Sequence, residues 1–188
     1  MVVRERYGLA EPFILSVGTL EPRKNLAGTL HAYRLLRQRL PDAPCLVLVG
    51  GSGWGIDERR LVGAENASRV RRLAYLPDED VAALYAACSA FVYPSFYEGF
   101  GLPVAEAMAL GAPTITSRVS SLPEVAGDAA LLIDPHDPDE IAAALERVLV
   151  DDELSARLRA DGPVRAGQFT YERCAAQTMR VYEESIAG

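Results

Sequence analysis

Residues 12–25 read PFILSVGTLEPRKN, and this stretch contains the pattern that decides the fold. The run at 13–17 is short and apolar and stops at Gly18, which is typical of a buried strand. Asn25 then offers a side-chain cap to a helix that apolar spacing predicts as far as Arg39. A buried strand, a polar loop and a helix in this order form the first unit of an alternating α/β chain.

The same alternation continues to the end of the chain. Apolar runs predict further strands at residues 45–49, 70–76, 90–93, 113–116 and 130–133. Helices are predicted at 57–65, from a cap at Asp78, from Pro103 to Gly111, and at 138–150, 153–160 and 171–186, with a short turn around 122–124. Continuous apolar runs are typical of parallel strands that are covered on both faces. The order therefore predicts a doubly wound, open parallel sheet of Rossmann type.

Length and composition limit the classes of protein to which the chain can belong. Its 188 residues favour a single domain over 1–188, and 49% apolar with 24% charged residues are ordinary globular values. A net charge of -7 disfavours a broad surface for nucleic acid or anionic lipid. Three cysteines without CxxC spacing favour a reduced, cytoplasmic chain. No apolar run approaches the roughly 20 residues of a membrane span.

Candidate binding residues are sought where strands end, because doubly wound sheets bind ligands beyond the carboxyl ends of their strands. Arg23 and Lys24 follow the first strand and precede a helix start, where backbone N–H groups and the helix dipole attract anions. Arg23 can grip two oxygens at once and Lys24 adds a mobile charge, so the pair suits a phosphate. Spacing alone slightly favours the plain alternative, a solvated pair of loop charges.

Two further loops contain glycines. Residues 50–53 read GGSG and follow the second strand, where a backbone can approach a ligand closely. This run has neither the GxGxxG order nor a Walker lysine, so a plain turn is the stronger interpretation. Residues 98–106 read EGFGLPVAE, and the helix that begins at Pro103 points its positive end at the same edge of the sheet. Backbone amides there suit an anion or a sugar hydroxyl.

The two carboxylates of this segment have different expected places. Glu98 lies in the loop, with plain solvent exposure as the alternative, and Glu106 lies on the first helical turn, where it can also simply complement the dipole. A paired-carboxylate hydrolase is conceivable but leaves the cationic loop unexplained. The two histidines, His31 and His136, have no metal-ligand spacing, so no metal site is predicted.

Together these segments resemble the carboxyl-terminal domain of the group 1 retaining glycosyltransferases. The resemblance is carried by VGTLEPRKN at 17–25, VGGSGW at 49–54, PSFYEGFGLPVAEAMALGAP at 94–113 and SSLPEV at 120–125. Glu98 and Glu106 match the E-x7-E signature of that family. The family has a two-domain GT-B fold, so the resemblance implies that this chain is the second half and that an amino-terminal, acceptor-binding domain is absent.

The resemblance also implies a role for each candidate residue. Arg23 and Lys24 hold the diphosphate of a nucleotide-sugar donor, catalytic Glu98 faces the donor sugar and its reacting carbon, and Glu106 accepts hydrogen bonds from the ribose. The remaining donor-binding candidates are Gly18, Gly51, Phe100, Gly101 and Leu102. No metal cofactor is expected, because two cations and a helix end can neutralise the leaving diphosphate.

We therefore expect half of an enzyme that transfers a sugar from a nucleoside diphosphate sugar to a glycan or lipid-linked acceptor in polysaccharide biosynthesis. The PRKN variant and the Gly-Trp ending resemble the members that transfer mannose, and the isolated chain is expected to be inactive. The absent domain would allow peripheral attachment at the inner membrane face. Arg72 and Ala74 stand where the family often has Phe and Gly, so the base is left open. The alternatives are half of a sugar-nucleotide epimerase and a noncatalytic nucleotide-binding module.

Overall fold

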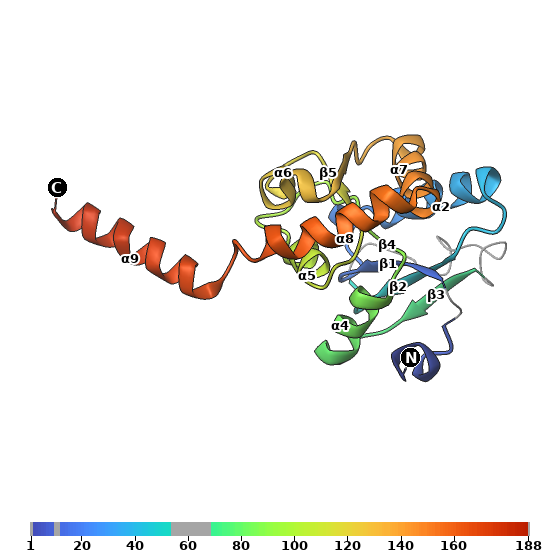
Figure 1. The fold of residues 1–188 in the computed structure, drawn as a ribbon, viewed down its shortest axis with the longest axis horizontal. Helices are drawn as coiled ribbons and strands as arrows, with labels where there is room; N and C mark the ends of the chain where they lie inside the picture. The colour runs from blue at the N-terminus through green and yellow to red at the C-terminus, as the bar shows by residue number, and fades with distance from the viewer. Residues whose placement is uncertain (1, 10–11, 54–68, 188) are drawn as a thin grey trace.

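The structure, a computed structural model, describes residues 2–9, 12–53 and 69–187. Six strands form one sheet in the order β3-β2-β1-β4-β5-β6, and every pair of neighbours is parallel (Figure 1). The strands are β1 (Phe13–Val17), β2 (Cys45–Val49), β3 (Val70–Leu73), β4 (Ala90–Tyr93), β5 (Thr114–Ser117) and β6 (Leu131–Ile133). This arrangement confirms the doubly wound, open parallel sheet.

Helices cover both faces of the sheet (Figure 1). They are α1 (Val2–Arg6), α2 (Leu26–Arg39), α4 (Asp78–Ala87), α5 (Leu102–Ala109), α6 (Leu122–Ala126), α7 (Pro138–Val150), α8 (Asp152–Ala166) and α9 (Tyr171–Ala187), with 3-10 turns η1 (Pro22–Lys24) and η3 (Gly127–Ala129). Asn25 caps α2 as predicted, because its side chain accepts a hydrogen bond from the amide of Gly28.

The core has one layer on each side of the sheet. Phe13 and Leu15 of β1 pack with the buried residues of α4, α5 and α6, whereas Ile14 packs on the opposite face with those of α2 and α7. All three side chains are fully buried. Burial on both faces is the reason that β1 is apolar at four of its five positions rather than at alternate ones.

Several boundaries differ from the sequence prediction. β3 ends at Leu73 rather than at residue 76, and Asp78 is the first residue of α4 rather than its cap, which is Pro77. The predicted turn at 122–124 is the start of helix α6. Smaller differences are that β5 and β6 each begin one residue later than predicted, and that the helix predicted at 57–65 lies outside the described residues.

The largest boundary error concerns α8, which continues through Pro163 to Ala166 instead of ending at residue 160. A proline inside a helix removes one backbone hydrogen bond. Packing compensates here, because Gly162 lies against the backbone of Met108 so closely that a Cβ would be 2.9 Å from its carbonyl oxygen. Tertiary contact between α8 and α5 therefore overrides the local signal to stop.

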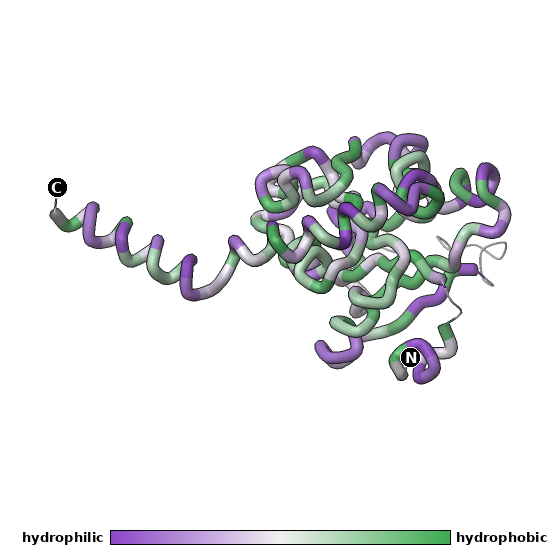
Figure 2. Tube along the Cα trace, viewed as in Figure 1, coloured by the Kyte–Doolittle hydropathy of each residue, from purple (hydrophilic) through white to green (hydrophobic). Residues whose placement is uncertain are grey.

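Helix α9 projects away from the rest of the domain (Figure 1). Hydrophilic and hydrophobic residues alternate along it (Figure 2), and its described side chains from Tyr171 to Ile186 are exposed. Within the described part of the chain, no helix combines the length and the apolar character that crossing a membrane requires.

Candidate functional site

The loops that follow β1 and β4 meet at one edge of the sheet. β1 and β4 are neighbours in the sheet, and the strand order reverses between them. In doubly wound sheets a crevice opens beyond the carboxyl ends of the strands at such a switch point. The two loops are joined directly, since the amide of Phe96 donates to the carbonyl oxygen of Arg23 at 2.8 Å. Topology thus brings the cationic loop and the Glu98 loop together.

The carboxylate of Glu98 is the centre of a hydrogen-bonded cluster in this crevice. Its Oε1 accepts from Lys24 Nζ at 2.6 Å and from Tyr93 Oη at 2.7 Å. Ser95 Oγ lies 3.0 Å from the same oxygen. Its Oε2 forms an ion pair with Arg23 Nη1 at 2.8 Å. Both predicted cations therefore already contact the predicted catalytic carboxylate.

The electrostatics of the cluster follow from this geometry. Burial alone would raise the pKa of Glu98, but the hydrogen bonds from Lys24 and Tyr93 outweigh it and hold the pKa below its usual value. Burial likewise works against the charge of Arg23, but the hydrogen bonds and the negative charges of Glu98 and Glu21 together outweigh it, so the pKa of Arg23 is raised. Arg23 Nε also pairs with Glu21 at 2.8 Å. Two cations and two carboxylates therefore balance in charge.

One expectation is wrong at this point. Glu98 is only 8% exposed, so the alternative of plain solvent exposure fails. Arg23 pairs with Glu21, its neighbour in sequence, and both cations also pair with Glu98, which is 74 residues from Lys24. The sequence could not reveal the pairing with Glu98, because the two loops meet only where β1 and β4 lie side by side in the sheet.

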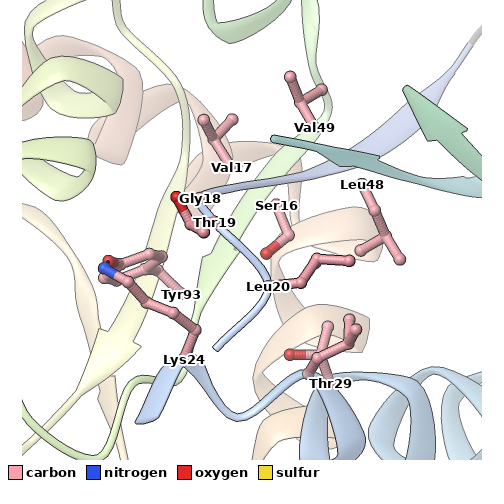
Figure 3. Close-up of a pocket in the computed structure, with 11 residues that line it drawn as sticks. Ser16, Val17, Gly18, Thr19, Leu20, Lys24, Thr29, Leu48, Val49 and Tyr93 are labelled. Atoms are coloured by element: carbon pink, nitrogen blue, oxygen red, sulfur yellow. Dashed lines mark hydrogen bonds between the residues drawn. The ribbon is translucent and has the colours of Figure 1, made fainter. Parts of the chain in front are cut away.

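Lys24 and Tyr93 lie side by side under the Gly18 loop (Figure 3). Lys24 Nζ is 4.8 Å from the centre of the Tyr93 ring and also donates to its hydroxyl. A cavity of about 20 Å³ adjoins them, lined also by Ser16 and Thr29. That volume accommodates about one water molecule, so this cavity is no substrate pocket.

The glycines of the first two loops have distinct structural roles. Gly50 has a φ of +145°, and a Cβ there would lie 2.1 Å from the carbonyl oxygen of Gly18. A Cβ placed on Gly53 would likewise lie 2.0 Å from the carbonyl oxygen of Leu20. Both therefore pack backbone against backbone, as the turn interpretation requires. Gly51, the predicted donor-binding residue, faces open space instead.

The start of α5 presents backbone amides to the crevice. Among the described residues, the amides of Gly99, Phe100, Gly101 and Leu102 donate no hydrogen bond to the protein. Gly101 precedes the helix with a φ of +98°, and a Cβ there would lie 2.6 Å from the side chain of Leu122. A run of unpartnered amides at a helix amino terminus is suited to an anion.

Glu106 does not join the Glu98 cluster. It is the fifth residue of α5, so it lies on the second turn and not on the first, because the helix begins at Leu102. Its Oε2 lies 3.3 Å from Tyr85 Oη, and its exposed side chain lines a second pocket of about 530 Å³ with Phe100 and Leu102. The other lining residues come mainly from the junction of α8 and α9.

Sequence reasoning missed the residues that hold Glu98 in place. Tyr93 and Ser95 contact its carboxylate, while Ser120 and Ser121 donate to its backbone carbonyl, Ser121 at 2.9 Å. Ser120 adopts the left-handed conformation, with a φ of 59°. The SSLPEV segment at 120–125 indicated a family resemblance but gave no sign of a role in holding Glu98. A hydroxyl at a strand end was the available signal for Tyr93 and Ser95.

No group of three or more His, Cys, Asp or Glu side chains within the described residues is arranged to hold a metal ion. The expectation that no metal cofactor is required stays a prediction.

His136, one of the two histidines of the chain, stacks its ring on Phe96, with ring centres 4.7 Å apart.

Fold and site define the class of protein, which is a doubly wound α/β domain with two paired cations, a buried carboxylate and unpartnered backbone amides at its switch point. The family model "Glycosyl transferases group 1" matches residues 4–165, and the chain belongs to this family. It is 47% identical over 190 residues to the O-antigen chain mannosyltransferase B of Escherichia coli, covering 96% of this chain and 48% of that protein.

Solved structures agree with this assignment. Sucrose-phosphate synthase of Thermosynechococcus elongatus superposes with a TM-score of 0.83 at 32% identity, covering 98% of this chain and 48% of the other. Anabaena HepE in complex with UDP-glucose superposes with a TM-score of 0.82 at 22% identity, covering 98% and 52%, and shows the fold alone. The chain spans about half the length of these proteins.

Proposed function

We propose that this domain binds a nucleoside diphosphate sugar and forms the donor half of a retaining glycosyltransferase of polysaccharide biosynthesis. The observation that carries the proposal is the crevice at the β1–β4 switch point, where Arg23 and Lys24 face Glu98 beside the unpartnered amides at the start of α5. The likeness to an O-antigen mannosyltransferase favours mannose as the sugar and a glycan or lipid-linked molecule as the acceptor.

The other half of the enzyme is part of this proposal. Relatives about twice as long as this chain support an additional amino-terminal domain that binds the acceptor. The isolated chain then binds donor without transferring sugar, because transfer needs the acceptor held against the reacting carbon. Peripheral attachment at the inner membrane face is assigned to that other domain. The family match favours neither the epimerase half nor the noncatalytic module.

The residues divide the chemical work as follows. Arg23, Lys24 and the amides of the α5 start bind the diphosphate, and their positive charge stabilises it as it leaves. Glu98, held ionised by its donors, faces the sugar and stabilises the positive charge that develops at the reacting carbon. Gly18 and Gly51 let the donor approach the backbone of the first two loops, and Glu106 accepts hydrogen bonds from the ribose.

The first test concerns the phosphate site. We expect Lys24→Ala and Arg23→Ala each to weaken binding of GDP or UDP by about 1.5–3 kcal/mol, because each loses a charge-assisted phosphate contact. Binding of the corresponding nucleosides, which have no phosphate, should hardly change. Isothermal titration calorimetry on the 188-residue chain measures both. Arg39→Ala is the matched control, since Arg39 lies at the far end of α2 from the site and pairs there with Asp139 of α7. Equal losses for nucleoside and diphosphate would reject the assignment.

The second test concerns Glu106. We expect Glu106→Gln to weaken binding of nucleoside diphosphate about tenfold, because a neutral amide accepts ribose hydrogen bonds less strongly than a carboxylate. Binding of inorganic pyrophosphate, which has no ribose, should be unchanged. Glu146→Gln on α7 removes the same charge far from the crevice and serves as control. A parallel loss for pyrophosphate would mean that Glu106 acts on the fold or on the phosphate site.

A further inference from the structure

Tyr93 is a buried residue of the crevice for which the proposed function has no role. It is the last residue of β4 and only 2% exposed, and its ring stacks on Phe91 with centres 6.0 Å apart. Its backbone carbonyl accepts a hydrogen bond from Thr116 Oγ1 on β5 at 3.0 Å. Strand, stacking and hydrogen bond together fix the position of the hydroxyl. Tyr93 is therefore a rigid group at the point where the cations meet the carboxylate.

The hydroxyl of Tyr93 has two partners that use both of its hydrogen-bonding capacities. It donates to Glu98 Oε1 at 2.7 Å and accepts from Lys24 Nζ. Burial raises the pKa of Tyr93, and the hydrogen bond to Glu98 raises it further, so the phenol stays protonated and remains a donor. Its ring centre also lies 4.8 Å from Lys24 Nζ, and the ring lies 3.7 Å from a Cβ placed on Gly18.

A competition between carboxylate and phosphate follows from this arrangement. In the proposed function Lys24 binds the diphosphate, so its ammonium leaves Glu98 Oε1, which then loses a charged donor inside a buried site. An ionised carboxylate left without donors is costly, so each remaining hydrogen bond lowers the cost of the exchange. Tyr93 is a donor that does not depend on the cations, whereas the single proton of Ser95 Oγ is shared between Glu98 and the carbonyl oxygens of Arg23 and Tyr97.

We infer that Tyr93 is a positioning residue that holds Glu98 in place while Lys24 moves to the diphosphate of the donor. The inference rests on the proposed function, because it deepens the role of that same site. The Tyr93 hydroxyl at the end of β4 stays hydrogen-bonded to Glu98 when Lys24 leaves, so the carboxylate keeps a partner while the ammonium pairs with the diphosphate.

A double-mutant cycle tests this inference. Tyr93→Phe keeps the ring, the stacking on Phe91 and the contact of the ring with Lys24, and removes the hydroxyl together with its hydrogen bonds to Glu98 and from Lys24. We expect it to weaken binding of inorganic pyrophosphate to the 188-residue chain about tenfold, since a hydrogen bond to a charged group is lost. In the Glu98→Gln background the same substitution should have little effect, because no carboxylate remains to be held. An equal loss in both backgrounds would overturn the inference.

A second measurement does not depend on any ligand. Carbon-detected NMR titration of the Glu98 carboxyl should give a higher pKa in Tyr93→Phe than in the wild type, because a donor to the ionised form is removed. Tyr33→Phe is the control, since its hydroxyl contacts the carbonyl oxygen of Pro44 in the opposite core layer, and it should leave the pKa unchanged. An unchanged pKa in Tyr93→Phe would also overturn the inference. If pyrophosphate fails to bind the wild type, the proposed function falls while the titration still decides the role of Tyr93.

Discussion

Glu98→Gln is expected to reduce sugar transfer at least about a thousandfold in a two-domain enzyme that contains this chain. A carboxylate can stabilise the positive charge that develops at the reacting carbon, and an amide of the same shape cannot. The measurement is the initial rate with a radiolabelled nucleotide sugar at saturating acceptor. Glu146→Gln, which removes a surface carboxylate from α7, is the control and should retain full activity.

The same substitution should act on binding in the opposite direction. Glu98 neutralises Arg23 and Lys24, so its removal gives the crevice an additional positive charge. We expect the affinity of the 188-residue chain for GDP or UDP to rise about tenfold, because the cations no longer have to leave a carboxylate. The family resemblance places Glu98 against the donor sugar, and its ion pairs with both cations add this expected effect on the diphosphate. Lower affinity in Glu98→Gln would contradict the competition described above.

Glu98 also predicts a dependence of stability on pH. Its pKa in the folded chain is lowered, so the stability it contributes is fully present above the ordinary glutamate pKa of about 4.3. That contribution is lost as the pH falls through the lowered value. Urea unfolding of the wild type and of Glu98→Gln should therefore differ most near neutral pH and converge in acid. A difference that stays constant down to acid pH would argue against an ionised, paired Glu98.

The second large effect is structural. Gly50→Ala should lower the free energy of unfolding by about 3 kcal/mol, because overpacking and a strained backbone add together. The new Cβ would lie 2.1 Å from the carbonyl oxygen of Gly18, and Gly50 has a φ of +145°. The Cβ is fixed directly to the backbone and the group that it meets is a backbone carbonyl, so neither can move without shifting the loop that leads to Arg23. Urea unfolding monitored by circular dichroism measures the loss.

Gly51→Ala provides a matched control one residue away. A Cβ at Gly51 would contact nothing within 4 Å, so its free energy of unfolding should change by no more than about 0.5 kcal/mol. The same variant tests the prediction that Gly51 approaches the donor, because added bulk should then weaken nucleotide-sugar binding without loss of stability. If both variants lost a similar amount of stability, the close contact at Gly50 would not be the cause of its destabilisation.

The sequence was sufficient for the architecture because the signals involved are local. Continuous apolar runs at 13–17, 45–49 and 90–93 are required wherever a parallel strand is covered on both faces, and the structure places strands at all three. The cap at Asn25 was readable for the same reason, since its hydrogen bond spans three residues. Local signals failed where packing opposed them, as at Pro163, which lies inside α8 because α8 packs closely on α5.

The sequence by itself also determined which residues are candidates for the chemistry, because charges, glycines and helix starts at strand ends are visible in one dimension. Only the tertiary structure decided how these residues meet. Strand order makes β1 and β4 neighbours, and that places Lys24 2.6 Å from Glu98 across 74 residues of chain. It also separates Glu106 from this cluster and adds Tyr93 to it. The physical reason is that contacts between distant loops depend on sheet topology and packing, which no local periodicity encodes.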